Sequence, residues 1–342
     1  MQHYLQKLLN GNKLTQDEMT IVAHSLFNEE ISDSEVASVL TALKVRGESV
    51  EEITAIVEVL REKAMPITKA LNNVMDNCGT GGDGIKSFNV STTSAFVLAG
   101  AGAKVAKHGN RSVSSRTGSA DVLEELGVAL DFTSDEVEHL IDTNGIAFLF
   151  APYVHHQLKR IMKVRQELSV PTIFNLIGPL INPVALETQF LGVYRRDMLM
   201  KMAAVLNKLG RKRSIVVNGA GHMDEASLAG ENHFVLLEEG ELIPFTLHPS
   251  EVGLNTYSNE NIVGGDAKVN AQILLDVLHG KPSPYYETTL FNAGIGLFSS
   301  GIATSIKDGV DLARKSIETG CALEKLNHLI DYSQKRKKKE IS

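Results

Sequence analysis

The chain has 342 residues and a formal net charge of −7 at pH 7, and this acidic balance argues against a general nucleic-acid binder. Its length suits one large domain or two ordinary ones. The two cysteines, Cys78 and Cys321, are far apart and outside any CxxC pair, so neither a zinc site nor a disulfide framework is indicated. No apolar stretch approaches the length of a membrane-spanning helix, and we expect a soluble, cytoplasmic protein.

Residues 1–68 are predicted to form a helical bundle. The capping-box pattern, a Ser or Thr followed three residues later by Glu, occurs at Thr15, Ser32 and Ser49 and opens a helix each time. Pro66 ends the series. A bundle of this size cannot bury all its apolar faces alone, so we expect it to pack against the remainder of the chain.

The residues after Pro66 alternate between predicted strands and helices. We expect strands at 74–77, 104–107, 147–150, 190–194 and 214–218, and helices at 92–101, 120–126, 134–143, 155–168 and 197–209. An antiparallel hairpin at 233–237 and 242–247 is predicted to follow them. Alternation of this kind is typical of the α/β class, with a mostly parallel central sheet covered by helices. Pro171, Pro179 and Pro183 interrupt regular structure after residue 168.

The most informative segment is residues 76–124, which concentrates glycines, hydroxyl side chains, cationic groups and His108. Short apolar runs at 74–75 and 105–106 each give way to a polar, glycine-rich turn that opens a helix. Backbone N–H groups at such helix N-termini are unpaired and bind phosphate well. The segment therefore predicts a site for a highly phosphorylated small molecule.

Two familiar glycine motifs are excluded for this segment. Residues 79–84 fit G-x-G-x-x-G, but a dinucleotide site needs a carboxylate about 20 residues further on, and residues 98–104 contain none. Residues 79–87 resemble a P-loop, but Ile85 separates Gly84 from Lys86, so the spacing is too long.

Five motifs, occurring in family order over most of the chain, resemble the anthranilate phosphoribosyltransferase family. They are GTGGD (79–83), NVST (89–92), KHGNRSVSSRTGSAD (107–121), KVRQELSVPTIFNLIGPLINP (163–183) and GHMDE (221–225). The resemblance implies transfer of the 5-phosphoribosyl group from phosphoribosyl diphosphate to the amine of anthranilate, with Mg²⁺ as cofactor. This reaction is the second step of tryptophan biosynthesis from chorismate and releases pyrophosphate.

The resemblance also implies a domain division. A small helical domain, residues 1–68, is completed by a helical segment at about 165–188, and the large α/β domain comprises 69–164 and 189–342. Substrates bind in the cleft between the domains, as in nucleoside phosphorylases and related phosphoribosyltransferases. The family dimerises through the helical domain, so we expect a homodimer with no nucleic-acid or membrane partner.

The resemblance assigns three groups of site residues. For phosphoribosyl diphosphate it implies Gly79, Gly81, Gly82, Asp83, Ser87, Asn89, Val90, Ser91, Thr92, Lys107, His108, Gly109, Asn110, Arg111, Ser112, Val113, Ser114, Ser115 and Ser119. For anthranilate it implies Gly79, His108, Asn110, Pro152, His155, Arg165 and Gly178. For the metal ion it implies Ser91, Asp224 and Glu225.

The residue types suit these roles. Glycine amides can approach a diphosphate because no Cβ obstructs them. Asp83 would repel a bare diphosphate, and it suits a ribose hydroxyl, a metal ion or an Asx-turn. Lys107 suits a phosphate as a point charge, although a lysine at a strand end is also commonly solvated. Magnesium prefers carboxylates together with phosphate oxygens and waters, which Asp224 and Glu225 can complement.

The acceptor site needs a cation beside an apolar slot. Arg165 offers a fork that matches a carboxylate, and Asn110 offers an amide. The two adjacent histidines, His155 and His156, are expected to differ, with one of them only at the surface. An arylamine is nucleophilic when neutral, so no strong general base is assigned, and His108 is the candidate.

Two other functions share this architecture. A pyrimidine nucleoside phosphorylase has a glycine loop and a similar turn after a strand, but a different loop sequence from residues 79–83. A non-catalytic relative that binds nucleic acid should lose the acceptor residues and gain basic surface, whereas this acidic chain keeps Asn110 and Arg165.

Overall fold

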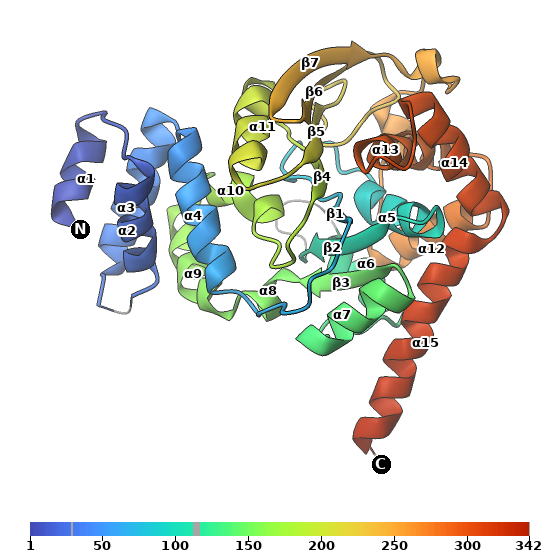
Figure 1. Cartoon of the computed structure of the whole chain (residues 1–342), viewed down its shortest axis with the longest axis horizontal. Coiled ribbons are helices and arrows are strands. Elements are labelled where there is room, and N and C mark those ends of the chain that lie inside the picture. The colour runs from blue at the N-terminus through green and yellow to red at the C-terminus, as the bar shows by residue number, and fades with distance from the viewer. Residues whose placement is uncertain (29, 112–116, 342) are drawn as a thin grey trace.

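The computed structural model describes residues 1–28, 30–111 and 117–341. A bundle of helices lies to one side of a larger α/β unit (Figure 1). The bundle contains α1 (Gln2–Leu9), α2 (Gln16–Leu26), α3 (Asp33–Arg46) and α4 (Val50–Glu62). The capping boxes predicted at Thr15, Ser32 and Ser49 are all formed, and each side chain accepts a hydrogen bond from a backbone amide three residues later.

A second set of short helices lies beside the bundle. These are α8 (Ala151–Val154), η1 (His156–Leu158), α9 (Lys159–Leu168), α10 (Phe174–Ile177) and η2 (Gly178–Leu180). Ile161 and Val164 of α9 share a hydrophobic core with the bundle helices. The prolines that follow α9 keep α10 and η2 short, as expected.

The central sheet has seven strands in the order β3-β2-β1-β4-β5-β6-β7. The strands are β1 (Val74–Asp76), β2 (Lys104–Gly109), β3 (Ile146–Phe150), β4 (Thr188–Gly192), β5 (Arg213–Asn218), β6 (Asn232–Glu238) and β7 (Glu241–Leu247). The first five are parallel, and β6 and β7 form the predicted antiparallel hairpin. Its turn places Glu239 and Gly240 at φ of 50° and 83°, the left-handed conformation that tight hairpins require.

Both faces of the sheet are buried. Along β4, Phe190 joins the core on one face and Leu191 joins the core on the other, because successive side chains point to opposite sides. The second core continues into α11 (Leu199–Lys208), which η3 (Arg196–Met198) precedes, and into the helical bundle. One continuous core therefore joins the bundle to the sheet, as expected for a bundle too small to bury all its apolar faces alone.

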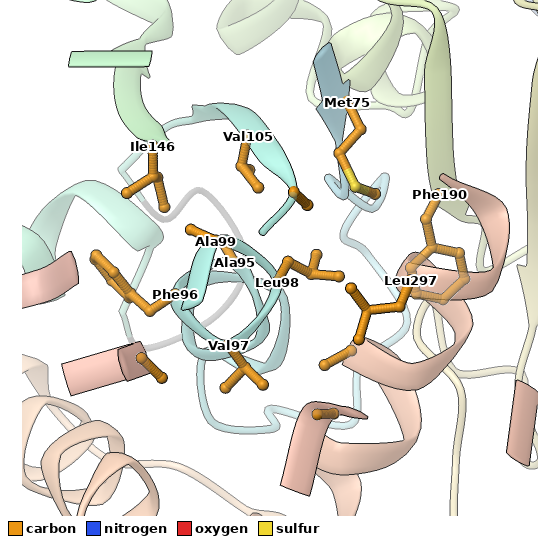
Figure 2. Close-up of a cluster of buried hydrophobic side chains, with 14 of the residues drawn as sticks. Met75, Ala95, Phe96, Val97, Leu98, Ala99, Val105, Ile146, Phe190 and Leu297 are labelled. Atoms are coloured by element: carbon orange, nitrogen blue, oxygen red, sulfur yellow. The ribbon is translucent and has the colours of Figure 1, made fainter. Parts of the chain in front are cut away.

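The opposite face of the sheet is covered by a helix that has almost no solvent-exposed side. Almost every residue of α5 (Val90–Gly100) is buried. Figure 2 shows Phe96, Val97 and Leu98 pointing in different directions from this helix into the surrounding apolar side chains. The N-terminus of α5 is therefore held rigidly beneath the loop that follows β1.

The remaining helices enclose α5 and the edge of the sheet. They are α6 (Ser119–Glu125), α7 (Ser134–Thr143), α12 (Ala267–Leu278), α13 (Pro284–Ser299), α14 (Ile306–Glu318) and α15 (Cys321–Ile341), with short turns η4 (Pro249–Val252) and η5 (Asn259–Ile262). In Figure 1, α15 extends beyond the rest of the molecule. None of the helices over the described ranges is both long and apolar enough to cross a bilayer.

Candidate active site

The predicted site residues gather at the carboxyl ends of the parallel strands. Loops carrying them leave the ends of β1, β2 and β5. The carboxyl ends of neighbouring parallel strands lie at one edge of a sheet, which is where α/β proteins bind their ligands.

The glycine loop after β1 is tied to two other loops. The amide of Thr80 donates to the carbonyl of Gly192 at 2.9 Å, and the amide of Gly81 donates to Oδ2 of Asp224. Gly81 and Gly82 have φ of 68° and 86°, which glycine adopts without strain. The loop is thus held in place by these hydrogen bonds, one of which joins the Gly81 amide to the Asp224 carboxylate.

Asp224 is enclosed by glycines. A Cβ at Gly79 would lie 2.5 Å from Oδ2 of Asp224, and one at Gly192 would lie 1.6 Å from its main-chain oxygen. Both contacts are too short for a side chain, so a larger residue at either position would force Asp224 to move. Asp83 completes the loop, and its Oδ1 accepts from the amide of Ile85 at 3.0 Å in the Asx-turn geometry anticipated for it.

Buried carboxylates dominate the charge of this region. Asp224 and Glu225 are both buried, and burial is the main cause that raises the pKa of each. Asp83 raises the pKa of Asp224 further, and the charge of Asp224 does the same for Glu225. Lys107 lowers the pKa of Glu225 in part. Burial thus favours the protonated form of both carboxyls, and a divalent cation would favour their charged form.

The side chains of this region suit a magnesium ion that takes its other ligands from substrate phosphates and waters. Within the described ranges, no three Asp, Glu, His or Cys side chains form a ready-made metal cage. Magnesium needs only one or two carboxylates when substrate phosphates and waters supply the other ligands. Asp224 and Glu225 could provide these carboxylates, and a hydrogen bond from the Ser91 side chain lowers the pKa of Glu225 in part.

Lys107 is buried rather than solvated. It is only 2% exposed, and its Nζ donates to the carbonyl of His108 at 3.1 Å. A buried ammonium needs negative charge nearby, and Asp76 and Glu225 are the carboxylates on which its charge acts. The commonplace interpretation, a solvated lysine at a strand end, is wrong.

The N-terminus of α5 also departs from an ordinary helix cap. Asn89 occupies the N-cap position, but its side chain makes no capping hydrogen bond. Instead its Oδ1 accepts from Asn270 at 2.8 Å, and its Nδ2 donates to the carbonyl of Thr117 at 3.4 Å. Thr92 is buried, and its hydroxyl has no hydrogen-bond partner in the part of the chain that the structure describes. The Val90 amide donates to the Phe88 carbonyl at 2.7 Å, which leaves the next two amides, of Ser91 and Thr92, to meet an anion.

Two buried histidines lie against each other near Gly178. The rings of His108 and His155 are 5.6 Å apart and nearly perpendicular. Burial lowers the pKa of His155 to about 4 and also lowers that of His108, on which the Gly178 backbone has a smaller opposing effect. Nε2 of His108 and both ring nitrogens of His155 lack partners among the described residues. The two imidazoles are therefore neutral at pH 7 and have unused hydrogen-bonding capacity, whereas His156 is exposed.

Arg165 lies on α9 without a carboxylate partner among the described residues. Its guanidinium is half-buried, contacts Oδ1 of Asn175 at 3.3 Å and lies 5.4 Å from the centre of the Phe174 ring. Burial lowers its pKa. A desolvated cation of this kind favours an anionic ligand.

Three other predicted site residues are exposed at the surface. Arg111 is exposed and paired with Asp121 and Glu124, both at 2.8 Å. Asn110 and Pro152 are also exposed.

The remaining residues predicted to bind phosphoribosyl diphosphate support the loops around the N-terminus of α5. Ser87 pairs with Val263 in an isolated bridge, and Val90 lies in a small apolar cluster. Gly109 ends β2, and the Ser119 hydroxyl donates to the Asn110 carbonyl at 3.2 Å. Four of the residues predicted to bind phosphoribosyl diphosphate lie outside the described residues: Ser112, Val113, Ser114 and Ser115.

Asparagines that the sequence did not single out support the site. Asn292 of α13 holds Ala226, the residue after Glu225, by accepting from its amide and donating to its carbonyl, both at 2.9 Å. Asn270 of α12 orients Asn89 in the same indirect way. A lone asparagine inside an otherwise apolar helical segment was the available signal for Asn292.

Comparisons with known proteins agree with this geometry. Residues 71–323 match the model of the glycosyl transferase family a/b domain, and residues 2–64 match its helical bundle domain. An anthranilate phosphoribosyltransferase of Bacillus cereus is 58% identical over 330 residues, covering 96% of this chain and 97% of that protein. The chain belongs to the anthranilate phosphoribosyltransferase family.

Solved structures of the family share the whole fold. The enzyme from Thermus thermophilus aligns with a TM-score of 0.92 at 39% identity, over 96% of this chain and 99% of that one. The enzyme from Saccharomyces cerevisiae, solved in complex with PRPP and Mg, aligns with a TM-score of 0.89 at 30% identity, over 97% of each chain. The predicted family and the α/β fold with a helical bundle are therefore confirmed.

Proposed function

We propose that this chain transfers the 5-phosphoribosyl group of phosphoribosyl diphosphate (PRPP) to the amine of anthranilate and releases pyrophosphate, as the second step of tryptophan biosynthesis from chorismate. The observation that carries the proposal is the cluster of buried carboxylates around Lys107, next to the neutral pair His108 and His155. Such a cluster repels a bare diphosphate and accepts one that arrives with magnesium.

The donor side is built for charge. Asp224, Glu225 and Ser91 would hold magnesium, which when bound neutralises charge on the departing diphosphate. Lys107 supplies a fixed positive charge. Oriented donors come from the α5 N-terminus and from those glycine-loop amides that do not already donate to Gly192 or Asp224. Electrostatic positioning of this kind stabilises a leaving group without proton transfer.

The acceptor side is built for orientation. Arg165 holds the anthranilate carboxylate, and the neutral imidazoles of His108 and His155 line the slot for its ring. The amine attacks C1 of the ribose as the bond from C1 to the diphosphate breaks, and it then loses a proton. A neutral His108 can accept that proton, whereas a protonated one could not.

The helical bundle suits a second copy of the chain. Leu9, Ile21, Val45 and Val170 expose apolar side chains there, with Val45 82% exposed. Exposed apolar side chains of this kind support a homodimer through the helical part, and light scattering tests it. The acidic charge is consistent with a cytoplasmic enzyme.

One assay tests the function. The protein is mixed with Mg²⁺, PRPP and anthranilate, and pyrophosphate release is followed together with the fluorescence of anthranilate. We expect release that requires all three components. Phosphorolysis of a pyrimidine nucleoside, or tight binding of an oligonucleotide without transfer activity, would contradict the proposal.

A further inference from the structure

Asp76 is a buried carboxylate that the proposed mechanism does not use. It ends β1 and is 0% exposed. Its Oδ2 accepts from Nδ2 of Asn182 at 3.0 Å, and its Oδ1 accepts from the amide of His108 at 3.4 Å. A buried charge is retained at such a position only when hydrogen bonds or an opposite charge compensate for its desolvation.

Asn182 completes the same arrangement. Its Nδ2 also donates to the carbonyl of Ala106 at 2.8 Å, while its Oδ1 accepts from the amide of Val184 at 3.0 Å. The side-chain amide of Asn182 therefore bridges Asp76 and Ala106. Its orientation is fixed, because its nitrogen donates to these two residues and its oxygen accepts from Val184.

These side chains stand where the main-chain ladder between β1 and β2 stops. The last paired residues of the two strands are Met75 and Val105. Beyond them β1 turns away into the glycine loop, whereas β2 continues to Gly109. On this side of β2, Asp76 and Asn182 satisfy main-chain groups of Ala106 and His108 in place of β1, while the other side stays paired with β3 as far as Gly109.

The arrangement also joins the two substrate regions. Asn182 follows the segment Gly178–Leu180, and the carbonyl of Pro179 in that segment accepts from Nε2 of Gln189 at 2.7 Å. Asp76 and Asn182 therefore hold the end of β2, which carries Lys107 and His108, in register with the backbone that lies beside His108. Burial raises the pKa of Asp76, and the nearby charge of Lys107 opposes this effect in part.

We infer that Asp76 and Asn182 are a pair of positioning residues: Asp76 holds the end of β2 that presents Lys107 to the diphosphate, and Asn182 sets the position of the acceptor segment relative to His108. The inference rests on the proposed function. The parent protein, measured in the same experiments, tests that function separately, because it must bind PRPP and turn over anthranilate before any variant is interpreted.

The two residues predict different defects. Asp76→Asn places an amide donor against a second donor, either Asn182 or the His108 amide, and so displaces the strand end that carries Lys107. We expect its affinity for PRPP with Mg²⁺, measured by calorimetry, to fall at least about tenfold. Asn182→Ser keeps the carboxylate but loses the bridge, so we expect the anthranilate KM to rise about tenfold and the PRPP affinity to change less than about threefold.

Matched controls separate positioning from general stability. Glu52→Gln alters a carboxylate that is equally buried in the helical bundle, paired with Arg46. Asn144→Ser alters a buried asparagine that donates to the carbonyl of Lys325 at 3.0 Å. Both controls should lower the Tm while leaving the PRPP affinity and the anthranilate KM at parental values.

The inference is overturned if Asp76→Asn and Asn182→Ser lower only the Tm, as the controls do, or if each variant weakens both substrates equally. If Asp76→Asn does not fold, Asn182→Ser decides the question alone, because it leaves the buried charge intact. An unchanged anthranilate KM in that variant would then refute the pair.

Discussion

Replacing Arg165 with alanine should weaken anthranilate binding selectively. The guanidinium is half-buried and has no carboxylate partner among the described residues, so its charge is free for a ligand. Its contacts with Asn175 and with the face of Phe174 leave the planar fork oriented rather than mobile. A carboxylate can therefore form two parallel hydrogen bonds without a large ordering cost.

The size of the effect follows from the strength of such bonds. Losing a hydrogen bond to a charged group costs about 1.5–3 kcal/mol, and each 1.4 kcal/mol is about tenfold in binding. Arg165→Ala should therefore raise the anthranilate KM about 10- to 100-fold. Arg165→Lys should fall between the parent and the alanine variant, because it keeps the charge and loses the fork.

Steady-state kinetics with anthranilate varied, together with calorimetric titration of PRPP with Mg²⁺, would measure this effect. Lys163→Ala is the matched control, since Lys163 lies on the same helix but points to Asp33 at 3.0 Å. PRPP affinity should stay near the parental value in both variants. An unchanged anthranilate KM in Arg165→Ala, or equal losses for both substrates, would refute the assignment of Arg165 to the acceptor.

Four further predictions follow from the site. Gly81→Val should reduce PRPP affinity in calorimetry while the circular dichroism spectrum is kept, because valine is strained at a φ of 68° although open space surrounds the position. Asp224→Asn combined with Glu225→Gln should shift half-maximal activity to higher Mg²⁺, and a Mg²⁺ titration curve equal to the parent's would remove both residues from the metal site. Asn292→Ala should produce a weaker shift of the same kind, because it frees Ala226 and leaves both carboxylates in place. His155→Gln should flatten the pH dependence of the unfolding free energy between pH 6.5 and 4: the folded pKa of His155 is lowered to about 4, so the parent loses stability as the pH falls through this window, by up to about 3 kcal/mol, and parallel curves would count against a neutral His155.

The sequence predicts the parts of the fold that are encoded locally. The capping boxes at Thr15, Ser32 and Ser49 join residues only three apart, so their patterns survive in any tertiary context. The strands are short, apolar and bounded by turns, which places them well. In contrast, α13 was not predicted, because it is buried on nearly all sides and its sequence lacks the apolar and polar alternation of a surface helix.

The same distinction applies to the site. The glycine loop and the Asp224–Glu225 pair are contiguous motifs, and the family resemblance together with their chemistry suggests their roles. The residues that support them are not contiguous: Asp76 and Asn182 are 106 positions apart, and Ala226 and Asn292 are 66 apart. No periodicity in a sequence encodes such a pairing, and only the packed fold brings the partners together.

The glycines around Asp224 have a consequence for how the protein tolerates substitution. At Gly79 a Cβ would meet the Asp224 carboxylate at 2.5 Å and the main-chain oxygen of that residue at 2.8 Å, and a smaller residue at position 224 would remove only the first contact. At Gly192 the obstacle is the main chain of residue 224, which no side-chain change can move. In a saturation library scored by protein abundance, alanine at position 79 should be partly rescued when position 224 is also changed to glycine. Alanine at position 192 should find no such suppressor, so the two glycines that contact Asp224 would differ in their genetic epistasis.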